Sequence, residues 1–286
     1  MQPFVGLANM LSLSFMDHAF IAGGVIALAS GLVGYFLVLR GQVFTGDALS
    51  HVSFTGALGA LALGIDLRYG LYLGCVAIAL LMAVVARKGV ADDVVIGSVF
   101  SFVLGLGVFF LAIYSTQSQA SANATAGVNV LFGSMLGLSS SQTVVDVIIG
   151  CVVIGAIVLL GRPLLFSSID PDVAEARGLP VKALGLCFLV IVGVTAGEAT
   201  QAVGALLLLG LLATPAGAAQ LLMSRPYSAL FLSATIALGA VWSGLVLSYA
   251  FPNLPVSFSI LALVTMVYCL SWLVARVNDS RRRILL

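Results

Sequence analysis

Asp47 and His51 are the residues of this sequence whose types and spacing are best suited to chemistry. They stand four residues apart in GDALSHVSFTG, residues 46–56, a stretch that is otherwise apolar, small or uncharged. In a helix this spacing places both side chains on one face. A carboxylate oxygen and an imidazole nitrogen together suit Zn²⁺ or Mn²⁺. Two ligands are too few for a closed structural site, so the pair predicts a transient metal site that a second copy of the chain would complete.

Both Asp47 and the more isolated Glu198 also have a purely structural interpretation. Asp47 follows Arg40 closely and would then only cap a helix, with His51 packed beneath it. Ionisable groups inside a membrane favour the functional interpretation, because burying them is costly and they usually mark an ion or substrate path. Glu198, in TAGEATQAVG, is either the solvated end of a helix or a metal-attracting mouth. Asp146 stands near the start of the apolar run at 144–161 and is expected only to complement the helix dipole.

The elements that must position these residues are membrane helices. Of the 286 residues 61% are hydrophobic and 8% are charged, against about 25% charged residues in ordinary soluble domains. Runs of about 20 apolar residues recur along the chain, and each is long enough to cross the hydrocarbon core. We expect an all-α, polytopic membrane bundle that forms a single domain over residues 1–286. The nine expected spans are 18–39, 47–65, 69–86, 94–114, 144–161, 182–198, 202–222, 227–248 and 254–275.

The distribution of basic residues predicts the orientation of this bundle. Cytoplasmic loops of membrane proteins collect Lys and Arg. With the N-terminus outside and nine spans, Arg68 is the only one of the 12 lysines and arginines that falls outside. The predicted topology is therefore N-out and C-in. An external loop with a short, partly inserted helix is expected at 115–142, and Pro215 predicts a kink or break in the seventh span.

The sizeable inside loop, residues 162–182, predicts a short cytoplasmic helix. Ser167, Ser168 or Asp170 would cap it, Pro171 would begin it, and Gly178 would close it. Such a helix is either a simple connector or a handle through which another subunit moves the bundle. The residues that would carry the second role are Asp170, Asp172, Glu175, Arg177 and Gly178.

Several motifs are absent from the sequence. There is no G-x-x-x-x-G-K-[ST], so the chain cannot form an ordinary nucleotide-binding loop by itself. There is no HExxH, and the two histidines, His18 and His51, leave a serine nucleophile without a nearby base. We therefore expect a transport subunit rather than an enzyme, with no cofactor bound by this chain and no nucleic-acid partner.

Three stretches resemble the metal permeases of the ABC-3 family. They are GDALSHVSFTGALGALALG, DPDVAEARGLPVKALG and QAVGALLLLGLLATPAGAAQLL, and the resemblance covers about residues 18–275 in order and spacing. Family members often have a proline soon after the histidine, where this chain has Thr55.

The resemblance implies an importer of zinc, manganese or iron in a bacterial cytoplasmic (inner) membrane. The implied assembly is a homodimeric or pseudo-dimeric permease, two cytoplasmic ATP-binding subunits that hold the ATP, and an extracytoplasmic metal-binding protein. Asp47 and His51 would line the translocation path of a Zn or Mn ion, and the helix within 170–179 would sit in a groove of the ATPase. Two alternatives stay open: an ion-coupled secondary transporter or channel, and an ABC permease for siderophores or cobalamin.

Overall fold

Each of the nine predicted spans corresponds to one helix of the computed structural model. The model describes residues 14–85, 93–115, 131–205 and 208–284, and these ranges contain helices and turns but no strand. The all-α prediction is therefore confirmed. The nine helices are α2 (Ser14–Leu39), α3 (Val43–Ala62), α4 (Leu67–Val85), α5 (Asp93–Ser115), α7 (Ser140–Ile169), α9 (Val181–Val203), α10 (Leu208–Leu222), α11 (Pro226–Ala250) and α12 (Val256–Ile284).

Seven of these helices are long and apolar enough to cross a membrane, and α3 and α10 are the two exceptions. Helix α10 has only 15 residues. Helix α3 has 20 residues, but Asp47, His51 and several small polar residues interrupt its apolar run. The chain is a multi-pass membrane protein, whereas the count of nine spans and the N-out orientation stay predictions.

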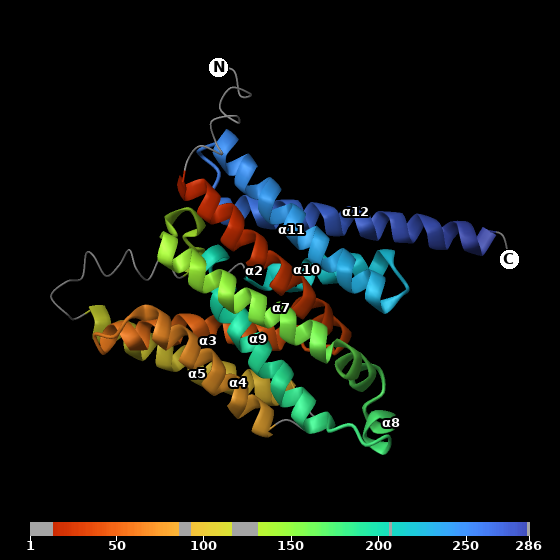
Figure 1. Cartoon of the computed structure of the whole chain (residues 1–286), viewed down its shortest axis with the longest axis horizontal. Helices are drawn as coiled ribbons and strands as arrows, with labels where there is room; N and C mark the ends of the chain where they lie inside the picture. The colour runs from red at the N-terminus through yellow and green to blue at the C-terminus, as the bar shows by residue number, and fades with distance from the viewer. Residues whose placement is uncertain (1–13, 86–92, 116–130, 206–207, 285–286) are drawn as a thin grey trace.

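The helices form a central group flanked by two outer groups (Figure 1). Helices α2, α7 and α9 pack against one another at the centre. Helices α3, α4 and α5 pack on one side, and α10, α11 and α12 pack on the other. In an apolar stretch of 18 residues within α2, 78% is buried inside the protein, whereas the corresponding value for α5 is 17%. The outward apolar side chains of α4, α5 and α12 are therefore available to lipid or to another subunit.

Glycines bring the helices that carry the candidate site into backbone contact. A Cβ atom on Gly56 of α3 would lie 2.2 Å from the Gly70 carbonyl oxygen of α4, and a Cβ on Gly70 would lie 2.1 Å from the Gly56 carbonyl oxygen. Similarly, a Cβ on Gly34 of α2 would overlap the backbone of Leu212 in α10. Close approach at small residues is a common way for membrane helices to pack. It holds α3 tightly against α4.

Two differences from the predicted helices change the arrangement of the chain. Helix α7 does not end at 161 but continues through Pro163 to Ile169, so the first eight residues of the predicted inside loop belong to α7. The apolar run at 202–222 does not break at Pro215, which lies within α10. The break lies instead at Gly204, which has a φ of 96° and ends α9.

The described part of the segment predicted to be an external loop contacts the break at Gly204. A 3-10 turn, η1 (Met135–Gly137), precedes α7, whereas residues 116–130 lie outside the described ranges. The Ser134 amide donates a hydrogen bond to the Gln201 carbonyl at 3.0 Å. A Cβ on Gly204 would lie 2.3 Å from the Leu131 carbonyl oxygen, so only glycine permits this approach.

Candidate functional site

Helix α3 positions Asp47 and His51. The helix begins at Val43 with Gln42 as its N-cap, and its first turn contains no acidic residue. Asp47 therefore lies beyond the positions at which a side chain caps a helix. Both Asp47 and His51 are half-buried.

Both side chains lie on the side of α3 that faces α5. Asp47 lines a cavity of about 330 Å³ together with residues of α3 and α5, including Ile96 and Phe100. The His51 imidazole packs edge-on against the Phe100 ring, with 5.1 Å between the ring centroids. Gly97, which also lines this cavity, is exposed. The pair therefore lies near the surface of the protomer rather than in its packed centre.

One copy of the chain does not complete a metal site at this pair. Within the described ranges, no group of three or more His, Cys, Asp or Glu side chains is placed to hold a metal ion. A carboxylate and an imidazole can bind an ion only weakly without further ligands. Water, backbone oxygens or a second copy would have to supply the remaining ligands.

Glu198 does not join Asp47 and His51, and it is not the solvated end of a helix. It lies in α9, five residues before the last helical residue, and its exposed fraction is 1%. Its carboxylate lies against Gly150 of α7, because a Cβ added there would be 3.0 Å from Glu198 Oε1. The structure thus places Glu198 between α7 and α9, whereas Asp47 and His51 face α5.

The sequence predicts that Asp146 only complements the dipole at the start of its helix, and this prediction is wrong. Helix α7 begins at Ser140 with a capping box between Ser139 and Gln142, and its first turn contains no acid. Asp146 lies in its second turn with an exposed fraction of 2%. The available signal was an acid inside an apolar run, which is costly and therefore uncommon without a role.

The predicted inside helix is present as α8 (Pro171–Ala176). Of the three predicted caps, Asp170 is the one used, and its Oδ1 accepts a hydrogen bond from the Val173 amide at 3.0 Å. Ser167 and Ser168 instead donate to the Leu164 carbonyl at the end of α7.

Gly178 closes α8 as predicted. It has a φ of 84°, the Gly178 amide donates to the Glu175 carbonyl, and the Leu179 amide donates to the Ala174 carbonyl. This is the hydrogen-bond pattern of the Schellman motif. A six-residue helix is thus held by a cap at each end.

Helix α8 protrudes from one end of the bundle, between the ends of α7 and α9 (Figure 1). Ala174 is buried and anchors the helix, whereas Asp172, Glu175 and Arg177 are exposed. The Arg177 guanidinium lies over the Phe166 ring, 5.7 Å from its centroid, which is within the limit of about 6 Å for a cation–π contact. The exposed charged side chains of α8 thus face away from the bundle, and the capped helix holds their backbone in a defined conformation.

Comparison with known proteins shows the family of this chain. The ABC 3 transport family model matches residues 12–275. The manganese transport system membrane protein MntC of Listeria monocytogenes is 30% identical over 270 residues, which cover 94% of each chain. The manganese import system permease protein ScaB of Streptococcus parasanguinis is 30% identical over 262 residues, which cover 91% of each chain.

A solved structure has the same fold. The structure of PsaBC from Streptococcus pneumoniae in complex with Fab contains a chain that matches with a TM-score of 0.80 and 26% identity, over 95% of both chains. The chain described here is therefore a membrane-spanning permease subunit of the ABC type, and it belongs to the ABC 3 transport family.

Proposed function

We propose that this chain is the permease of an ATP-driven importer that moves a divalent transition-metal ion, Mn²⁺ or Zn²⁺, into the cytoplasm. The observation that carries the proposal is the position of Asp47 and His51 on the α5-facing side of α3, with Asp47 lining a cavity. The names of the relatives MntC and ScaB favour Mn²⁺. The carboxylate of the pair suits Mn²⁺, and its imidazole suits Zn²⁺.

An incomplete ligand set fits a transported ion better than a resident one. Conduction requires a site that is favourable enough for the ion to enter and weak enough for it to leave. A homodimer would bring two Asp47 and His51 pairs together and give four ligands from side chains. Because Asp47 and His51 lie near the surface of the protomer, a second copy can approach them without unfolding the bundle.

The proposed partners follow from the missing nucleotide-binding motif and from the exposed helix α8. It has no nucleotide-binding motif, so a separate cytoplasmic ATPase subunit would hold the ATP. Helix α8 is the proposed contact with that subunit, since its charges are exposed and its two caps keep it rigid. An extracytoplasmic metal-binding protein would deliver the ion, and it would contribute to the selection of the metal.

Metal uptake in cells that lack their own manganese and zinc importers tests the transport function. Expression of this chain with its ATPase and binding-protein partners is expected to restore saturable Mn²⁺ accumulation, measured by elemental analysis. Uptake is expected to stop when the ATPase carries a Walker A lysine substitution. Uptake that persists with the inactive ATPase would instead identify an ion-coupled transporter or a channel. Accumulation of a metal chelate in place of the free ion would identify the chelate-permease alternative.

Charge reversal on α8 tests the coupling role. Glu175→Lys and Arg177→Glu are expected to reduce uptake by about 10-fold or more, because each mismatched charge at a protein interface costs several kcal/mol. ATP hydrolysis by the assembled complex should lose its dependence on the metal-loaded binding protein. Arg225→Glu, an exposed charge reversal outside α8, is the matched control and should leave both activities unchanged. Normal coupling in both α8 variants would remove the coupling role.

A further inference from the structure

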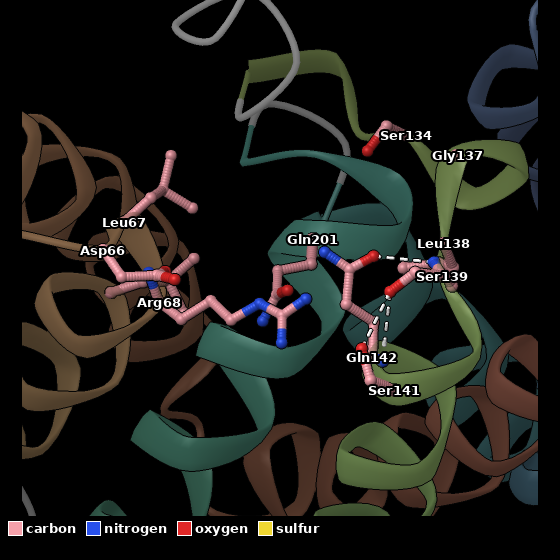
Figure 2. A pocket seen from close by; sticks show the side chains of 11 residues that line it. Asp66, Leu67, Arg68, Ser134, Gly137, Leu138, Ser139, Ser141, Gln142 and Gln201 are labelled. Carbon is pink, nitrogen blue, oxygen red and sulfur yellow. Dashed lines mark hydrogen bonds between the residues drawn. The ribbon is translucent and has the colours of Figure 1, made fainter.

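A cavity of about 480 Å³ opens at the end of the bundle that carries η1. We call it the outer pocket, following the predicted orientation. Polar side chains from four elements line it, and Figure 2 shows Arg68 reaching into it from α4 toward α9. Arg68, Gln142 and Gln201 are the lining residues from which the helices continue inward, whereas Asp66 lies at the exposed rim.

On each of three helices, one residue lines this pocket and a second polar residue lies one helical turn deeper in the bundle. On α7, Gln142 lines the pocket and Asp146 follows it by four residues. On α9, which ends at the pocket, Gln201 lines it and Glu198 precedes it by three residues. Residues three or four apart lie on the same face of a helix. Asp146 and Glu198 therefore lie beneath the floor of the outer pocket.

Helix α4 adds a third group in the same way. Arg68 lines the pocket, and Tyr72 follows it by four residues. Gln201 donates a hydrogen bond to the Tyr72 hydroxyl at 3.1 Å, and Tyr72 interacts electrostatically with both carboxyl groups. Gln201 thus links the lining of the outer pocket to the Tyr72 hydroxyl, which lies near the two acids.

The two acids are buried, and most of their carboxylate oxygens lack a hydrogen-bond partner. Glu198 is 1% exposed and Asp146 is 2% exposed. In the described part of the chain, neither carboxylate oxygen of Glu198 has a hydrogen-bond partner, and neither does Asp146 Oδ2. Asp146 and Glu198 interact with each other electrostatically. Arg68 supplies one positive charge that acts on Asp146. A single positive charge does not compensate two carboxylates this deeply buried, so a bound cation would be needed to keep both ionised.

Small residues make room for the Glu198 carboxylate. A Cβ on Gly150 would be 3.0 Å from Glu198 Oε1 and 2.4 Å from Val25 Cγ1. A Cβ on Gly197 would be 2.9 Å from Leu71 and 3.1 Å from the Tyr72 ring. Gly150 therefore lets α7 approach the Glu198 carboxylate, and Gly197 lets the Leu71 and Tyr72 side chains of α4 pack closely against α9.

We propose that Asp146 and Glu198, together with the Tyr72 hydroxyl, form a second cation site that is entered from the outer pocket. The ligand is a hard divalent cation such as Mn²⁺, Ca²⁺ or Mg²⁺, because the groups that converge there are oxygen donors. The site is separate from Asp47 and His51, and it does not depend on the transport function proposed above.

Binding of Mn²⁺ to the purified complex in lipid nanodiscs tests this site. The Asp47→Asn/His51→Ala background removes the α3 pair, so that the remaining binding reports on the second site. This background is expected to retain saturable Mn²⁺ binding, measured by equilibrium dialysis and elemental analysis. Adding Glu198→Gln or Asp146→Asn should weaken it by at least about 10- to 100-fold, because even groups that only orient a metal ligand contribute that much. Ca²⁺ should compete better than Zn²⁺.

Two further variants separate a metal site from a structural acid pair. Tyr72→Phe keeps both acids and the aromatic ring, and it should still weaken Mn²⁺ binding in the same background. Asp66→Asn removes an exposed acid at the rim of the same pocket and should leave binding unchanged. If the background binds no Mn²⁺, or if Glu198→Gln and Asp146→Asn leave binding unchanged and raise thermal stability, the pair only holds a proton and the proposal is wrong.

Discussion

Asp47→Asn and His51→Ala are each expected to reduce metal uptake by at least about 10- to 100-fold, because even groups that only orient a metal ligand contribute that much. Asn keeps the shape of Asp47 but removes the anionic oxygen, and Ala removes the imidazole nitrogen. Both losses act on an ion that has few other side-chain ligands in one copy of the chain. Uptake of Mn²⁺ at a verified, equal level of membrane insertion is the measurement.

Two controls separate a ligand effect from a packing effect on α3. Ser50→Ala removes a hydroxyl that only donates to the Asp47 backbone carbonyl, at 2.6 Å. His18→Ala removes the other histidine, which lies in α2. Both variants should transport normally. Because His51 also packs on Phe100, His51→Phe should keep the packing and still lose transport. Normal uptake by Asp47→Asn and His51→Phe would refute the metal-path assignment.

Gly56→Ala and Gly70→Ala are expected to destabilise the fold by about 1–3 kcal/mol, the usual cost of overpacking a close contact. Each added methyl would lie about 2 Å from a carbonyl oxygen of the opposite helix. Backbone atoms cannot move aside as a flexible side chain can, so α3 and α4 must separate. The melting temperature of the detergent-purified protein, followed by fluorescence-detected size exclusion, is the measurement.

The chain offers a matched control for this substitution. Gly155 lies within α7 with open space where a Cβ would project. Gly155→Ala should therefore leave stability unchanged or raise it by about 0.5–1 kcal/mol, because alanine loses less conformational entropy than glycine in a helix. Equal melting temperatures for Gly56→Ala, Gly70→Ala and Gly155→Ala would contradict the close α3–α4 contact.

The consequence of the α3–α4 contact extends to the candidate site. Asp47 and His51 lie on the α5-facing side of α3, while Gly56 holds the same helix against α4. A partly separated α3 would change where the two ligands point. We therefore expect Gly56→Ala protein that survives purification to show reduced uptake as well as reduced stability.

Local sequence patterns were sufficient for the features that depend on one helix. Apolar runs of about 20 residues predict membrane helices whatever their neighbours are. The cap at Asp170 and the turn at Gly178 define α8 because their hydrogen bonds join residues within one helical turn. The four-residue spacing of Asp47 and His51 similarly determines that they share a face once α3 forms.

Only the tertiary structure decided which polar groups are buried together. The sequence allows Glu198 to be a solvated helix end and predicts that Asp146 only complements a helix dipole. In the structure, both lie buried at the contact of α7 and α9. Hydropathy records how apolar a segment is, but not which of its faces meets another helix. Asp146 and Glu198 are far apart in the sequence, and glycine contacts between helices bring them together. The same non-local packing places the break at Gly204, which contacts the segment that precedes α7, rather than at Pro215.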